Sequence, residues 1–199
     1  MRIILNCIYS GALISMQLII NRNIILRGKL MSMPDLGQVP YPHSLELREL
    51  TEAEKFVVRS LRKWLLGHWD ESHHVWRCML RECRASFGDE DGPKIVICIS
   101  KIVSTLVKYG NRKIRFHKPC CPCLDTDEYC LIRFITACQN NNGALARALA
   151  SWLLVDDGIG DFLTAGLQLG TNMKKHALQL PEIALGQTHA DNFKSYSLH

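Results

Sequence analysis

The sequence predicts an all-α fold, a compact bundle of about six helices with an irregular elbow between the third and the fourth. Apolar residues recur at helical spacing along most of 45–181. Capping signatures and glycines mark where the helices begin and end. The chain has 199 residues, 47% hydrophobic and 22% charged, which is ordinary for a globular protein with one buried core.

The first three predicted helices span 51–67, 70–86 and 91–110. Thr51 begins the first helix, with a glutamate three residues later that completes a capping box. Gly88 stops the second helix. The third opens on Asp-Gly-Pro, because proline is tolerated in the first turn of a helix.

An extended segment, 112–118, follows these helices and leads into the elbow. Its residues alternate in character and lie too close to Pro119 to be helical. The elbow ends at Asp125, the cap of the next helix, with Glu128 completing a second capping box. Three more helices are predicted over 125–140, 144–155 and 158–180.

The chain divides into four predicted parts. Residues 1–30 form an apolar, basic segment, which we interpret as an extension before an alternative start or as a membrane anchor. Residues 31–44 are a proline-rich linker, 45–181 the helical domain and 182–199 a polar tail.

The net charge of +5 does not indicate nucleic-acid binding. Four basic residues and no acidic one lie in 1–30, which leaves the remainder at +1. Proteins that bind DNA usually depend on a clear cationic excess against phosphate. A helix-turn-helix interpretation of 50–87 is disfavoured for the same reason, and because its helices are long.

Nine cysteines favour a reducing compartment. Several of them lie at helical spacing inside apolar stretches, where a free thiol packs as a small hydrophobic group. Their number is odd, so they cannot all pair within the chain. We therefore expect a cytoplasmic protein.

The elbow is the densest cluster of metal-binding side chains. Zn²⁺ prefers four tetrahedral nitrogen and sulfur donors, and a loop that leads into a helix often supplies them. The candidate ligands are His117, Cys120, Cys121, Cys123 and Cys130. Two alternatives stay open: a reactive or redox-active thiol with His117 as base, and an elbow whose thiols only pack. A thioredoxin fold is excluded because it needs a central sheet.

Other polar groups are interpreted as structural. His68, His73 and His74 are expected to be surface residues, since adjacent helical residues face different directions. Of the acidic residues near 156–161, Asp156 or Asp157 is expected to cap a helix. The charged residues of 52–63 are expected to form a solvated helix face.

These observations predict a small cytoplasmic helical protein that acts by binding a protein partner, in a regulatory role. Familiar phosphate-binding, hydrolase and metalloprotease motifs are missing, which favours binding over catalysis. A structural zinc site over residues 117–130, the elbow with the first turns of the next helix, would stabilise the fold. The alternatives are a thiol-dependent enzyme or redox sensor that uses the same cysteines, and a membrane-tethered domain if residues 1–30 are retained.

Overall fold

The structure, a computed structural model, describes residues 46–69 and 73–182. The described residues contain no strand and form one 3₁₀ helix and five α-helices: η1 (Leu47–Glu49), α2 (Glu52–Trp69), α3 (His73–Tyr109), α4 (Thr126–Gln139), α5 (Gly143–Leu153) and α6 (Asp156–Lys175). The predicted all-α class is confirmed. The predictions for 1–30, for 31–44 and for the tail beyond residue 182 lie outside the described residues.

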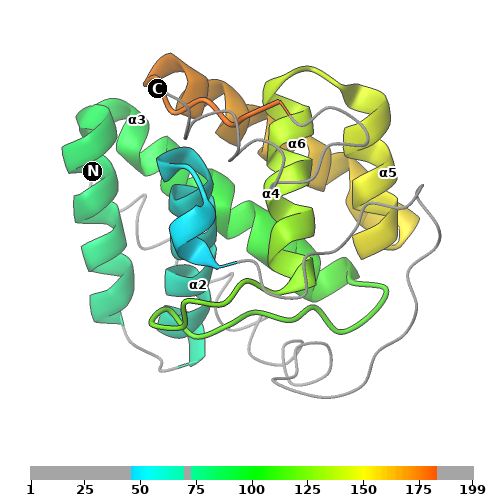
Figure 1. Cartoon of the computed structure of the whole chain (residues 1–199), viewed down its shortest axis with the longest axis horizontal. Coiled ribbons are helices and arrows are strands. Elements are labelled where there is room, and N and C mark those ends of the chain that lie inside the picture. The colour runs from blue at the N-terminus through cyan, green and yellow to red at the C-terminus, as the bar shows by residue number, and fades with distance from the viewer. Residues whose placement is uncertain (1–45, 70–72, 183–199) are drawn as a thin grey trace, which may run out of the picture.

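The expected count of six helices differs because two predicted helices continue as one element. The helices expected over 70–86 and 91–110 are both part of α3, which changes direction at Gly88 (Figure 1). Gly88 has φ +81°, in the left-handed region that glycine occupies without steric cost. The predicted break at Gly88 is therefore present as a kink.

Both predicted capping boxes are confirmed. The Thr51 hydroxyl accepts a hydrogen bond from the Glu54 N–H (3.4 Å), and the Glu54 carboxylate accepts one from the Thr51 N–H (2.8 Å). Asp125 and Glu128 form the same reciprocal pair at the start of α4. These bonds satisfy N–H groups that lack a partner within the helix.

The predicted cap of α6 was wrong. The helix begins at Asp156, so the N-cap is Val155, whose side chain makes no capping hydrogen bond. Asp156 and Asp157 lie in the first turn instead, where their negative charges interact favourably with the helix dipole.

The helices enclose one apolar core. α3 packs against α2 and α6, while α4 packs against α5 and α6. Gly166 of α6 faces Phe134 of α4 so closely that a Cβ at this position would lie 2.6 Å from the ring. Gly170 likewise approaches the backbone of Gln139. Both glycines therefore allow α6 to pack closely against α4.

The elbow runs along one end of this bundle, beneath α2 and α4 in Figure 1. It is a long connection without regular secondary structure between α3 and α4. Among the described helices, none combines the length and the apolar character that crossing a membrane requires.

Candidate functional site at the cysteine-bearing elbow

The extended segment before the elbow is anchored by alternate side chains. Ile114 and Phe116 are 1% and 5% exposed and belong to the core, while Lys113 beside them is exposed. A tight turn then follows, in which the Cys121 N–H donates to the Lys118 carbonyl (3.0 Å). Pro119 occupies the second position of that turn, where its fixed φ is favourable.

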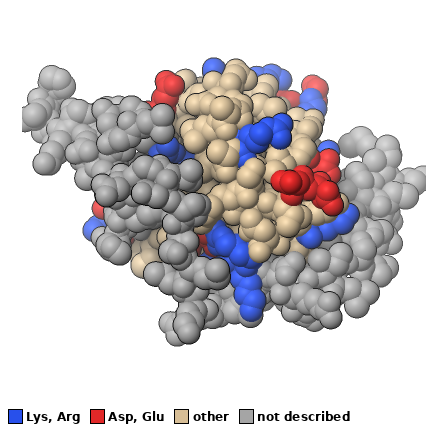
Figure 2. Space-filling view, turned by 90° about the vertical axis from the view of Figure 1, so that its right-hand side faces the viewer, with Lys and Arg blue, Asp and Glu red and all other residues tan. Residues whose placement is uncertain are grey.

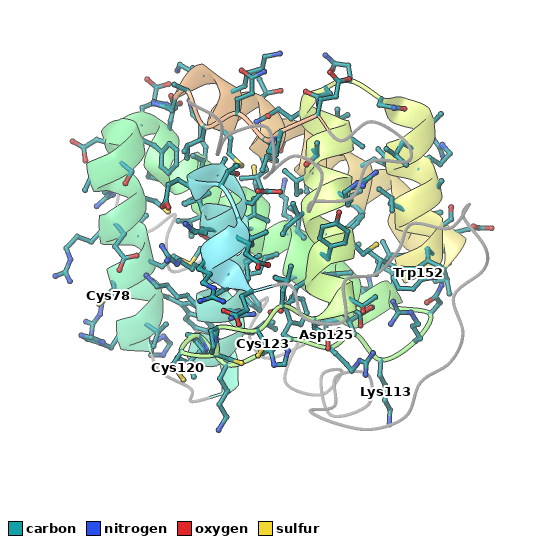
Figure 3. The ribbon with its side chains drawn as sticks, in the orientation of Figure 1. Cys78, Lys113, Cys120, Cys123, Asp125 and Trp152 are labelled. Carbon is teal, nitrogen blue, oxygen red and sulfur yellow. The ribbon has the colours of Figure 1, made fainter. Side chains whose placement is uncertain are left out.

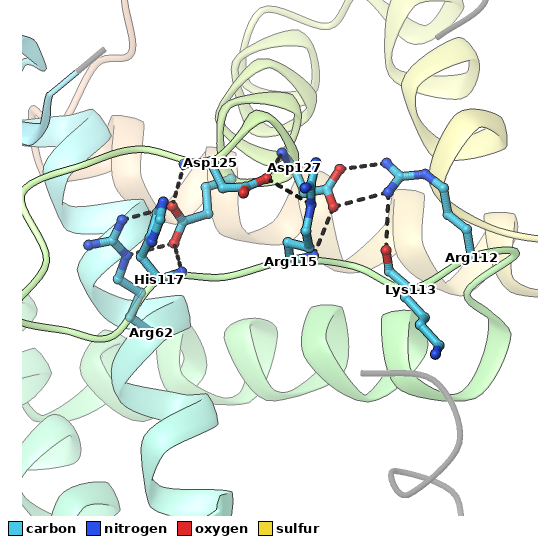
Figure 4. A network of polar contacts seen from close by, with 8 residues as sticks. Arg62, Arg112, Lys113, Arg115, His117, Asp125 and Asp127 are labelled. Atoms are coloured by element: carbon cyan, nitrogen blue, oxygen red, sulfur yellow. Dashed lines mark hydrogen bonds and ion pairs between the residues drawn. The ribbon is translucent and has the colours of Figure 1, made fainter. Parts of the chain in front are cut away.

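Arg62 extends from α2 to the elbow, where it belongs to a network of polar contacts (Figure 4), and its side chain is fully buried. Its Nε and Nη2 donate to the two carboxylate oxygens of Glu128, at 2.6 and 2.7 Å. Its Nη1 and Nη2 also donate to three backbone carbonyls of the elbow: those of Lys118 (3.4 Å), Cys121 (2.7 Å) and Cys123 (2.6 Å). Five bonds engage the whole donor capacity of a guanidinium.

The first turn of α4 binds the backbone of the extended segment. Asp127 accepts from the Arg115 N–H (2.8 Å), and Glu128 accepts from the His117 N–H (3.1 Å). Asp127 also receives two hydrogen bonds from the Arg112 guanidinium. Two buried carboxylates on one helical turn therefore hold this segment, which pairs with no strand among the described residues.

The Arg112 guanidinium lies over the Trp152 ring of α5, 3.8 Å from its centroid. Charge, hydrogen bonds and stacking thus connect the extended segment to α4 and α5. The elbow is fixed by protein groups at both of its ends, in the way that a structural metal ion would fix it.

The elbow thiols differ in exposure, and Figure 3 shows Cys120 and Cys123 on the connection between α3 and α4. Cys120 and Cys123 are exposed and Cys121 is half-buried. The carbonyls of Cys121 and Cys123 accept hydrogen bonds from Arg62, which fixes the backbone at these two residues while their thiols stay near the surface. A side-chain hydrogen bond shared with Cys121 and an unfavourable Coulombic interaction with Cys121 raise the pKa of the Cys123 thiol.

Cys130, the last of the predicted ligands, lies in the core. It is 3% exposed, and burial raises the pKa of its thiol to about 12. Such a thiol keeps its proton at neutral pH and is a poor metal ligand, because metals bind the thiolate.

His117 is half-buried, and the bond that fixes it is made by its backbone N–H. Within the described residues, no three His, Cys, Asp or Glu side chains are arranged to hold a metal ion. Of the five predicted ligands, Cys121 lies near enough to Cys123 to raise the pKa of its thiol. The zinc site stays a prediction.

The chain just before α2 contacts the same elbow. The Leu47 N–H donates to the Pro122 carbonyl (2.7 Å), and Glu46 pairs with Cys123 in an isolated antiparallel bridge. Pro122, which lies between Cys121 and Cys123, is therefore in contact with the segment before α2.

The sequence interpretation predicted the capping role of Glu54 but missed the burial of both Arg62 and Glu54, because it assigned the two side chains to a solvated helix face. These residues are 1% and 0% exposed. A signal existed for Arg62: it lies four residues after Val58 and three before Leu65, both buried, and so on the same side of α2.

Basic side chains form no common patch on the face drawn in Figure 2, where the described Lys and Arg lie apart and among Asp and Glu. Comparisons with protein-family models, with curated proteins and with solved structures gave no match to this chain.

Proposed function

We propose that this is a cytoplasmic regulatory binding protein whose elbow thiols, Cys121 and Cys123, form a reversible disulfide. The observation that carries the proposal is the Arg62 network. It fixes the carbonyls of both cysteines, and their side chains interact near the surface. A buried arginine supplies the cross-link expected of zinc, which leaves the thiols free for other chemistry.

The proposed chemistry is a two-electron oxidation by a peroxide. The Cys121 sulfur attacks one oxygen of hydrogen peroxide and loses its proton, the O–O bond breaks, and the departing hydroxide takes that proton, so that a sulfenic acid and water form. The Cys123 thiol then attacks the sulfenic sulfur, which releases a second water and closes the disulfide. The two thiols lose two electrons, the peroxide gains them, and a cellular thiol reverses the reaction by exchange.

A regulatory effect follows from where the disulfide would form. Cys121 and Cys123 flank Pro122, whose carbonyl accepts the Leu47 N–H. Closing so short a ring changes the backbone between its two sulfurs, because disulfides require a specific geometry. We therefore expect oxidation to weaken the contact between the elbow and residues 46–47, and so to alter the surface that a protein partner meets.

The location is part of this proposal. A switch of this kind needs a resting state in which its thiols are reduced, and the cytoplasm maintains that state. Four buried free cysteines agree with a reducing environment: Cys83, Cys98, Cys130 and Cys138.

Zinc binding is the second candidate, and the interaction between Cys121 and Cys123 favours it, since these thiols would supply two of the four donors. His117 and Cys120 are the nearest in sequence to complete the set. Elemental analysis of the full chain, purified under reducing conditions, decides this point. Less than about a tenth of an equivalent of zinc would exclude a resident ion.

The redox proposal is tested by treating the reduced full chain with hydrogen peroxide and measuring the masses of its tryptic peptides by mass spectrometry. The elbow cysteines and Cys130 lie in one tryptic peptide, between the cleavage sites at Arg115 and Arg133. Variants are therefore needed to show which two cysteines form the disulfide. We expect this peptide to lose two hydrogens in the wild type and in Cys120→Ser, and to keep them in Cys123→Ser. Loss of two hydrogens in Cys123→Ser as well would contradict the assignment.

Amide hydrogen exchange tests the regulatory step. Oxidation should speed exchange at Leu47, whose N–H is bonded to Pro122, and leave the centre of α4 unchanged. Equal exchange at Leu47 in both redox states would refute the coupling while leaving disulfide formation standing.

A further inference from the structure

A second cluster that contains a thiol lies on α3, where Figure 3 labels Cys78, and not on the connection that carries Cys120 and Cys123. His74, Cys78 and Arg81 are spaced four and three residues apart, which brings them onto one side of the helix. The Cys78 sulfur is 3.8 Å from Nδ1 and 3.7 Å from Nε2 of His74. Arg81 Nη2 donates to the same sulfur at 3.6 Å.

Cys78 differs from the cysteines of the core. Cys83, Cys98, Cys130 and Cys138 are buried, and burial raises the pKa of each of these thiols, to about 12 for Cys138. Those thiols are protonated and out of reach of a reagent. Cys78 is half-buried and has both a base and a cation beside its sulfur.

The cluster has the parts of an activated nucleophile. A cysteine nucleophile needs a base within hydrogen-bond reach, and His74 is in that position. A guanidinium beside the sulfur stabilises the negative charge that develops when the proton leaves. The same guanidinium argues against a metal ion between His74 and Cys78, because Arg81 would repel it.

The surroundings favour an anionic reaction partner. Arg77 and Arg81 are both exposed on this part of α3. The nearest acid along the helix, Glu82, is in contact with Lys63 of α2. A small molecule that carries carboxylates would therefore meet arginines as it approaches the sulfur.

We propose that Cys78 is a site of S-thiolation by a small disulfide that carries carboxylates, of the glutathione type. His74 takes the thiol proton while the Cys78 sulfur attacks one sulfur of the reagent. The reagent's S–S bond breaks, and its departing thiolate receives the proton from the imidazolium. One mixed disulfide and one free thiol form, and no further oxidant is needed. This inference does not depend on the elbow proposal.

The test is the rate of mixed-disulfide formation in the reduced full chain at neutral pH, with oxidised glutathione as the probe. Trypsin cleaves after Arg77 and Arg81 and isolates Cys78 from the other cysteines, so its modification is read separately from that of the elbow. We expect Cys78 to react at least about tenfold faster than exposed Cys120, as a positioned base allows. The cationic disulfide cystamine should react more slowly than glutathione disulfide at Cys78.

Two exposed histidines provide a matched pair of variants. His74→Gln should slow the reaction of Cys78 about tenfold. His73→Gln should leave it unchanged, because the His73 ring packs against Trp76 and not against the sulfur. Equal rates at Cys78 and Cys120, no effect of His74→Gln, or equal rates with the two disulfides would overturn the inference.

Discussion

Replacing Arg62 with methionine tests the structural basis of the elbow. Methionine keeps a long apolar stem and removes all five hydrogen bonds of the guanidinium. It leaves Glu128, 1% exposed, without its counter-ion. Removing one partner of a buried ion pair costs about 3–5 kcal/mol. Because Glu128 keeps the N–H donors of Asp125 and His117, we expect the lower end, about 3 kcal/mol.

The assay is urea unfolding of the full chain, followed by circular dichroism at neutral pH. Arg59→Met, on the exposed side of the same helix, is the control and should change the free energy of unfolding by less than about 0.5 kcal/mol. Adding Glu128→Gln to Arg62→Met should recover part of the loss, since a neutral amide removes the unpaired charge and still completes the capping box. A cost below about 1 kcal/mol for Arg62→Met would refute the argument.

Two further predictions concern the rest of the bundle. Hydrogen bonds from Lys175, His176 and Lys94 hold the pKa of Asp91 well below its usual value, so its contribution is present at neutral pH and lost as the pH falls below about 4. Asp91→Asn should therefore be less stable at neutral pH and show a shallower loss of stability below about pH 4 in urea titrations; identical slopes would contradict this. Gly166→Ala should cost about 1–3 kcal/mol by forcing a methyl group against Phe134. Gly160→Ala, in open space, should be neutral or stabilising by up to about 1 kcal/mol, and similar values for the two variants would exclude the close contact.

The helices were predictable because their signals are local. Capping boxes at Thr51 and Asp125 and the glycine at 88 act within a few residues, and each has the expected role. The direction that the second half of α3 takes after Gly88 was not predictable, since the packing of both halves in the bundle decides it. The prediction of the α6 cap was wrong because a shift of one residue in the start of the helix makes Val155 the N-cap in place of an aspartate.

The elbow was located from its composition, but its organisation was not. Arg62 and Glu128 are 66 residues apart, and no local pattern connects them. Spacing alone suggested that Cys130 could bind a metal together with the elbow thiols, whereas its side chain on α4 is buried in the core. Which thiols interact depends on tertiary contacts with α2, and these follow only from the folded structure.

Equilibrium oxidation of the full chain in glutathione buffers of graded ratio tests the central claim most directly. The quantity measured is the fraction of the elbow peptide that contains a disulfide, with Cys78 followed in its own peptide. We predict one two-electron transition, a tenfold change per about 30 mV, that is kept in Cys120→Ser and lost in Cys123→Ser. Elbow thiols that stay reduced in the most oxidising buffer, or a transition that survives Cys123→Ser, would contradict the proposal.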